Sequence, residues 1–160
     1  MTAERRLQEQ LGQLGWEMPP AAVAKGVYRS ALRVGDLLYV AGHLPVRPDG
    51  SLIIGCVGAE MDLAEGYSAA QWVGLGILAT VRQELGTLDH VRQVVKVLGA
   101  VRCTPDFDQQ PGVINGCSEL LVAVFGSEAG RGVRSALGVA GLPFGVPVEI
   151  EAVFQIGPDS

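Results

Sequence analysis

The feature that most constrains the fold is one change of hydrophobic period in the middle of the chain. Residues 28–57 carry short apolar runs separated by turn signals, a pattern that predicts β-strands. Over residues 62–85 the period becomes helical, and one stripe contains Leu63, Tyr67, Ala70, Gly74, Ile77, Val81 and Leu85. Its many small residues would let such a helix lie close against a sheet. The sequence therefore predicts a helix that covers one face of a β-sheet.

The same reasoning assigns the rest of the chain. Residues 3–14 predict a short amphipathic helix, and residues 16–26 read as a connector without periodicity. We expect a second covering helix over 111–125 and strands over 28–34, 36–42, 52–57, 91–101, 132–140 and 146–156. The first three strands are expected to be consecutive and antiparallel. The order β-β-β-α-β-α-β-β predicts an α+β fold with two helices on one face of the sheet. We expect a single domain over residues 1–160, with residues 1–23 as an N-terminal helical extension.

Composition indicates that folding of one copy leaves apolar surface exposed. The chain has 160 residues, of which 48% are hydrophobic and 18% charged, and 22 are glycine. Typical domains have about 25% charged residues and roughly half as much glycine. That is more apolar surface than one small domain comfortably buries. The simplest expectation is self-association.

Several classes of protein are disfavoured by the sequence. The longest uncharged run, from Gly66 to Val81, is too short to predict a membrane span, and the charged N-terminus does not resemble a secretory signal. We therefore expect a cytoplasmic protein. Three cysteines lack metal-ligand spacing, so we expect buried thiols, no metal and no disulfide framework. The net charge of −5 makes nucleic acid an unlikely partner.

The last two predicted strands carry the most chemical information. If they form a hairpin, matching their apolar faces places Arg134 and Glu149 on one side, with Ala136 opposite Glu149 and Arg134 diagonal to it. Ala136, Gly138 and Ala140 would leave space beside this pair. Arginine binds a planar carboxylate through two parallel hydrogen bonds, and a partly buried glutamate can hold or deprotonate water. The pattern is compatible with an anion pocket, and also with a simple cross-strand ion pair on a solvated face.

Several separated motifs together resemble the RidA/YjgF family. They are the stretch Gly26-Val27-Tyr28, the strand ending Val40-Ala41-Gly42-His43-Leu44-Pro45-Val46, Asn115 with Glu119, Arg134-Ser135-Ala136, Leu142-Pro143, and Val148-Glu149-Ile150-Glu151-Ala152. The resemblance covers about residues 24–156, in the order and spacing of the family. It implies a chorismate-mutase-like α+β fold with a mixed sheet. It also implies a homotrimer with the sheets turned inward and clefts between subunits.

The resemblance further implies an activity and a set of site residues. Family members hydrolyse reactive 2-imino and enamine acids, such as 2-iminopropanoate and 2-iminobutyrate, to 2-oxo acids and ammonia without a cofactor. In this sequence Arg134 matches the arginine that binds the substrate carboxylate, and Glu149 matches the glutamate that positions water. Tyr28, Asn115 and Gly42 match residues at the cleft.

Two departures from the family pattern bear on function. Ala136 stands where the deaminases have cysteine, which enlarges the pocket and removes a thiol. His43 stands where the archetype has an amide; it could titrate near neutrality, but we expect it in an exposed turn, which favours an incidental role. Three hypotheses follow: an imine deaminase, a non-catalytic trimer that binds a small carboxylate metabolite, and an endoribonuclease or translation inhibitor. The two histidines and the negative charge argue against the third.

Overall fold

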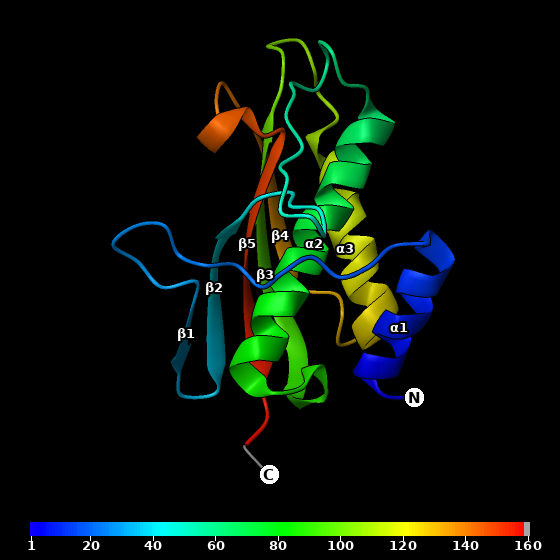
Figure 1. Ribbon diagram of the computed structural model, residues 1–160, viewed down its shortest axis with the longest axis vertical. Coiled ribbons are helices and arrows are strands. Elements are labelled where there is room, and N and C mark those ends of the chain that lie inside the picture. The colour runs from blue at the N-terminus through cyan, green and yellow to red at the C-terminus, as the bar shows by residue number, and fades with distance from the viewer. Residues whose placement is uncertain (159–160) are drawn as a thin grey trace.

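One five-stranded sheet organises the molecule, and the structure, a computed structural model, describes residues 1–158 of it (Figure 1). In space the strands follow the order β1-β2-β5-β3-β4. Their bounds are β1 (Ala31–Val34), β2 (Leu37–His43), β3 (Val91–Arg102), β4 (Val133–Val139) and β5 (Val148–Ile156). All neighbours are antiparallel except β3 and β4, which run parallel. The sheet is therefore mixed.

Helices cover one face of this sheet and leave the other face open. Helices α2 (Leu63–Leu85) and α3 (Gln110–Phe125) lie against the sheet, and α1 (Ala3–Leu14) packs beside α3 (Figure 1). Two short 3-10 helices, η1 (Leu88–His90) and η2 (Pro143–Gly145), lie in connections. The predicted α+β architecture and the three predicted helices are confirmed. None of the described helices is both long and apolar enough to cross a membrane.

Local chemistry explains why α2 begins and ends where it does. The carboxylate of Asp62 accepts a hydrogen bond from the backbone N–H of Glu65 at 2.8 Å, which satisfies one free donor of the first turn. At the other end Gly86 adopts the left-handed conformation, with φ 78°, and its N–H bonds to the carbonyl of Arg82. Between these caps the helix is long enough to span the whole sheet face.

The third predicted strand is wrong. Residues 52–57 contribute only isolated bridges, from Leu52 to Val46 and from Val57 to Met61 and Cys103. The apolar character of this run reflects burial rather than strand pairing, because Val57 is fully buried and packs against Gly66 of α2. Gly55, with φ 157°, and Gly58, with φ 93°, let the chain bend there instead of extending along the sheet.

The predicted terminal hairpin is also wrong, and this error has consequences for the site. Strands β4 and β5 do not pair with each other, because β3 lies between them. The segment β3-α3-β4 is a strand–helix–strand unit, and such units place their two strands parallel in one sheet. That crossover determined the position of β4 more strongly than the short loop between β4 and β5. The register therefore pairs Arg134 with Val97, and Glu149 with Ala100.

Close approach of α2 and α3 depends on glycine. A Cβ added at Gly116 would lie 2.1 Å from the carbonyl oxygen of Tyr67 and 3.1 Å from the Cβ of Ala70. Because the first of these contacts is with backbone, a side chain there would force the two helices apart.

We expect Gly116→Ala to lower the free energy of unfolding by about 3 kcal/mol, because the extra methyl group overpacks the helix interface. Gly12→Ala is the matched control: Gly12 lies in α1 with nothing within 4 Å of an added Cβ. There alanine should raise stability by roughly 0.5–1 kcal/mol through its helix propensity. Denaturant unfolding of both variants measures the difference, and equal effects would contradict this account of the interface.

Candidate functional site

Arg134 is held by two residues of α3. Its Nη1 donates a hydrogen bond to the Oδ1 of Asn115 at 2.7 Å and another to the Oγ of Ser118 at 3.2 Å. Asn115 and Ser118 are three residues apart, so they lie on the same side of the helix. The pairing with Val97, which is buried under the helices, explains why Arg134 extends from β4 toward α3. The sequence analysis named Arg134 and Asn115, and the structure brings them together.

The guanidinium keeps its remaining donors. Both hydrogen bonds that it makes to described residues leave from Nη1, and within residues 1–158 it forms no ion pair. The group lines a pocket of about 330 Å³ between α3 and β4, together with Arg131, Glu119 and Ser118. An amide and a hydroxyl orient the cation without neutralising it. Arg134 is thus prepared to bind an anion.

Glu149 lies on the opposite, open face of the sheet. Its register partner Ala100 and its neighbour Glu151 along β5 place it away from the helices, so it does not meet Arg134 within one chain. The expectation of both residues on one side is therefore wrong, and so is the alternative of a cross-strand ion pair. The error follows from the insertion of β3 between the two strands.

The small residues near Arg134 do not floor an empty cleft. Ala136 pairs with Gly99 and packs against the core, facing the helices like Arg134. A Cβ at Gly138 would lie 2.8 Å from the Nε2 of Gln110 and 3.0 Å from the Sγ of Cys103. Side chains from α3 and its approach occupy this side of β4. Small residues therefore permit close packing here rather than leaving a void.

Glu149 and Gly42 form a second group on the neighbouring strands. A Cβ added at Gly42 would lie 2.3 Å from the Oε1 of Glu149, so any larger residue here would displace this carboxylate from its position against the backbone of β2. Burial raises the pKa of Glu149, and the nearby charge of Glu151 raises it further. A carboxylate with a raised pKa is a stronger base toward a bound water than an ordinary one.

Tyr28 lies near the same end of β2 as Gly42. Its side chain is 55% exposed and its ring contacts Gly26. Two residues later, the carbonyl of Ser30 accepts a hydrogen bond from the N–H of Ala41 at 2.9 Å. The predicted site residues therefore divide into two groups. Arg134 and Asn115 lie on the helix side of the edge strand β4, next to Ala136. Tyr28 precedes β1, Gly42 lies on β2, and Glu149 lies on the open side of the central strand β5.

Sequence reasoning missed some polar residues near Arg134. Ser118 could have been found, because it follows Asn115 by one helical turn. The hydroxyl of Tyr67 donates to the carboxylate of Glu119, which links α2 to α3 beside the pocket. Burial and this carboxylate raise the pKa of Tyr67 to about 12. Within residues 1–158 no group of three or more His, Cys, Asp or Glu side chains is arranged to hold a metal ion.

The raised pKa of Glu149 predicts a pH-dependent stability. Between the ordinary glutamate value near 4.3 and the higher folded value, the folded state retains a proton that the unfolded state has lost. Stability is therefore lost as pH rises through this window, and the penalty is complete above it. Glu149→Gln should be more stable than the parent at neutral pH, and this advantage should shrink as pH falls from the raised folded pKa toward the ordinary value and be gone below about pH 4. Denaturant unfolding across pH measures this, with Glu84→Gln on the exposed side of α2 as control. An advantage independent of pH would contradict the assignment.

Comparisons with known proteins match most of the chain. Residues 8–146 match a family described as "YjgF/chorismate_mutase-like, putative endoribonuclease", and the match begins within α1. The chain is 38% identical over 156 residues to Protein TCP17 of Trypanosoma cruzi, covering 98% of both proteins.

Solved structures of similar sequence share the fold, with a higher and a lower TM-score. A protein described as a "putative endoribonuclease" from Shewanella oneidensis MR-1 superposes with a TM-score of 0.89 at 28% identity, covering 98% of this chain and 100% of the other. RidA from an Antarctic Psychrobacter superposes with a TM-score of 0.59 at 28% identity, covering 88% and 98%. The fold that the sequence motifs implied is confirmed, and the chain belongs to the YjgF/chorismate-mutase-like family.

Proposed function

We propose that this protein hydrolyses reactive 2-imino acids and their enamine tautomers to 2-oxo acids and ammonia. The observation that carries the proposal is the state of Arg134: it is fixed by Asn115 and Ser118, unpaired by any carboxylate of the described residues, and open to a pocket. A guanidinium in this state favours a substrate with a carboxylate. Such substrates include the 2-imino acids, whose carboxylate is bonded directly to the reacting carbon.

The proposed active site is formed between two copies of the chain. Arg134 and Glu149 lie on opposite faces of one sheet, so a single copy cannot present both to one small substrate. In a homotrimer, Arg134 and Asn115 of one copy can meet Tyr28, Gly42 and Glu149 of the next. This arrangement also accounts for the apolar residues on the open face.

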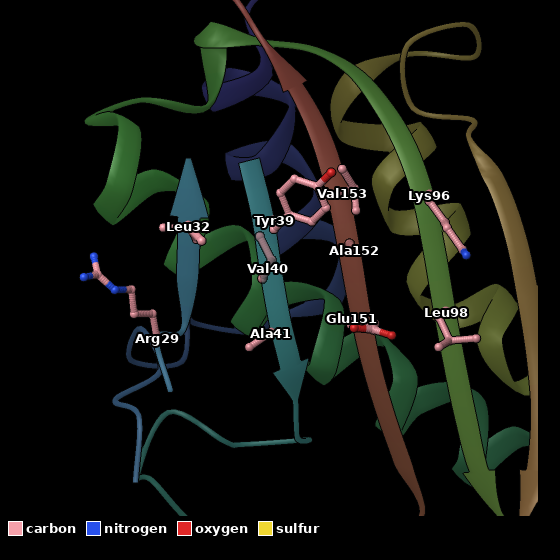
Figure 2. Close-up of a pocket in the computed structure, with 10 residues that line it drawn as sticks. All are labelled: Arg29, Leu32, Tyr39, Val40, Ala41, Lys96, Leu98, Glu151, Ala152 and Val153. Carbon is pink, nitrogen blue, oxygen red and sulfur yellow. The ribbon is translucent and has the colours of Figure 1, made fainter. Parts of the chain in front are cut away.

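The open face supports such an assembly. Its exposed large apolar side chains come from three different strands: Leu32, Val34, Tyr39, Val133 and Leu137. A groove of about 380 Å³ crosses this face, with Tyr39 and Leu98 among its apolar lining and Lys96 and Glu151 among its charged lining (Figure 2). A water-exposed face of this kind is typical of a surface that another protein copy covers.

The proposed chemistry needs only these side chains and water. Arg134 holds the carboxylate and so fixes the position of the iminium carbon. Glu149 accepts a proton from water while the water oxygen forms a bond to that carbon, and the C=N π electrons move to nitrogen. Glu149 returns this proton to the nitrogen. As the C–N bond breaks, the new hydroxyl group gives its proton back to Glu149 and its O–H electrons form the C=O bond, which releases ammonia and leaves the 2-oxo acid; the proton then passes from Glu149 to solvent. Positioning and one general base supply the required acceleration.

A non-catalytic carboxylate-binding trimer is the second candidate, and Ala136 is the observation that favours it. The family cysteine is absent at this position, and Cys117 on α3 does not replace it: burial raises its pKa to about 12, although Arg134 opposes that shift. Such a thiol stays protonated and buried. If the cysteine is essential for hydrolysis, this chain would retain binding alone.

The direct test is to generate 2-iminobutyrate in solution with an amino-acid oxidase and to follow its decay. We expect the protein to accelerate decay, and Arg134→Ala to reduce the acceleration by at least about a hundredfold, because the charge-assisted bidentate contact with the carboxylate and the orientation that it imposes are lost. Asn115→Ala should have a smaller effect in the same direction. Binding of 2-oxobutyrate without acceleration would select the second candidate, and RNA cleavage surviving Arg134→Ala would favour a ribonuclease.

The two-copy site predicts complementation between inactive variants. Arg134→Ala and Glu149→Gln should each be inactive as pure trimers. In co-refolded mixtures, a cleft is intact when one copy supplies Arg134 and its neighbour supplies Glu149. Random assortment restores about one quarter of the clefts at equal amounts. Activity of the mixture measures this recovery, and sedimentation confirms that trimers form. No recovery in well-formed mixed trimers would show that each cleft uses one copy only.

A further inference from the structure

His43 is a buried residue that the proposed chemistry does not use. The sequence analysis expected an exposed turn and an incidental role, but the side chain is only 4% exposed and faces α2. Both of its ring nitrogens lie within hydrogen-bond distance of partners: Nδ1 is 2.6 Å from the carbonyl oxygen of Ala41, and Nε2 is 2.7 Å from the Oγ1 of Thr80.

The partners of His43 determine its tautomer. A carbonyl oxygen can only accept, so Nδ1 must carry the proton that is donated to Ala41. In the neutral ring Nε2 then accepts from the hydroxyl of Thr80. The Oγ1 of Thr80 in turn accepts from the backbone N–H of Ala22 at 3.3 Å. Burial lowers the pKa of His43 below its ordinary value, which agrees with a neutral ring.

The chain of hydrogen bonds reaches both ends of residues 22–30, which we call the Tyr28 segment. At its start, the N–H of Ala22 donates to Thr80. At its end, the carbonyl of Ser30 accepts from the N–H of Ala41, the same residue whose carbonyl accepts from His43. Between these anchors, residues 25–29 are all exposed. The segment is therefore a surface loop whose two ends are held through His43.

The same hydrogen bonds hold a bulge in β2. The register pairs Val40 with Ala152 and His43 with Ile150, so Ala41 and Gly42 lie opposite the single residue Glu151. Figure 2 shows Ala41 near the end of β2, at the level of Glu151 on β5. The imidazole of His43 donates to the carbonyl of Ala41, two residues earlier, and this hydrogen bond spans the bulge and stabilises it. Gly42, within the bulge, is the residue that contacts Glu149.

We propose that His43 is a positioning residue: through Thr80 and Ala41 it holds the Tyr28 segment and the β2 bulge in one fixed arrangement. Resting on the proposed function, this arrangement sets Tyr28 and Gly42 relative to Glu149 in the cleft. His43 itself touches no substrate and carries no proton in the reaction. Its role differs from that of Arg134, which lies on the other side of the sheet order and does not depend on this relay.

The variant that tests the relay is Thr80→Val, which keeps the side-chain shape and removes the hydroxyl. We expect amide exchange of Ala22 and Ala41, whose N–H groups form the hydrogen bonds at the two ends of the Tyr28 segment, to accelerate about tenfold, because the anchor at Thr80 is lost. Hydrolysis of 2-iminobutyrate should slow by about tenfold or more, while 2-oxobutyrate binding, which depends on Arg134, should change little. Thr80→Ser keeps a hydroxyl and should retain most of the parent's amide protection and activity. His43→Gln should retain them as well, since an amide can donate to Ala41 and accept from Thr80.

A second measurement does not depend on activity. The chain has two histidines, so nitrogen NMR of the imidazoles is simple to assign with a His90→Gln variant. We expect His43 near neutral pH to be protonated at Nδ1 and unprotonated at Nε2. The opposite tautomer, or unchanged exchange of the Ala22 and Ala41 amides in Thr80→Val, would overturn the proposal. So would unchanged hydrolysis in a Thr80→Val protein whose segment has loosened.

If the parent protein hydrolyses no imino acid, the proposed function fails, and amide exchange with the tautomer alone decides whether His43 holds the segment. If the parent is active and only the variants of the relay are unchanged, the proposed function stands and the positioning role fails. Folding of each variant is checked by its thermal unfolding midpoint before either comparison.

Discussion

The central constraint on this molecule is the insertion of β3 between β4 and β5. One strand of twelve residues gains hydrogen-bonded partners on both sides, parallel on one and antiparallel on the other. The crossover through α3 turns Arg134 toward the helices, while the return of β5 leaves Glu149 on the open face. Everything proposed about a site shared between copies follows from this separation. A hairpin would have placed the same two residues together and made a second copy unnecessary.

The two faces of the sheet have different physical roles. The helix side is close-packed, with glycine where α2 and α3 approach. Both ring nitrogens of His43 have partners there, in Ala41 and Thr80, whereas Arg134 at the edge is oriented by Asn115 and Ser118 and keeps donors for a ligand. The open side exposes apolar side chains beside Glu149 and Glu151. Part of the exposed apolar surface of the described residues is thereby located on the open face of the sheet, and the rest lies in connections such as those of Val27, Ile54 and Phe144.

Sequence reasoning succeeded where the signal was local and failed where it depended on strand order. Helix α2 was predictable from its period and from Asp62 and Gly86 at its ends, and Asn115 and Arg134 from motif spacing. The pairing of β4 was not predictable in this way. The short loop to β5 favoured a hairpin, the crossover through α3 favoured pairing with β3, and local sequence patterns do not show which of the two is preferred. The strand predicted over residues 52–57 was wrong for a related reason, because an apolar run indicates that a segment is buried but not that it is an extended, paired strand. His43 was misjudged because a histidine beside a glycine resembles a turn until the helix above it is known.

The relay through His43 also separates two kinds of change that the chain can undergo. The Tyr28 segment is held by hydrogen bonds at Ala22 and Ser30, while residues 25–29 between them are exposed and do not form part of the core. Substitutions there can alter the walls of the cleft without disturbing the sheet. If the proposed cleft is correct, the Tyr28 segment is thus a part of the chain where its selectivity could change without a change in the sheet, because exposed loops vary more readily than the elements that support them.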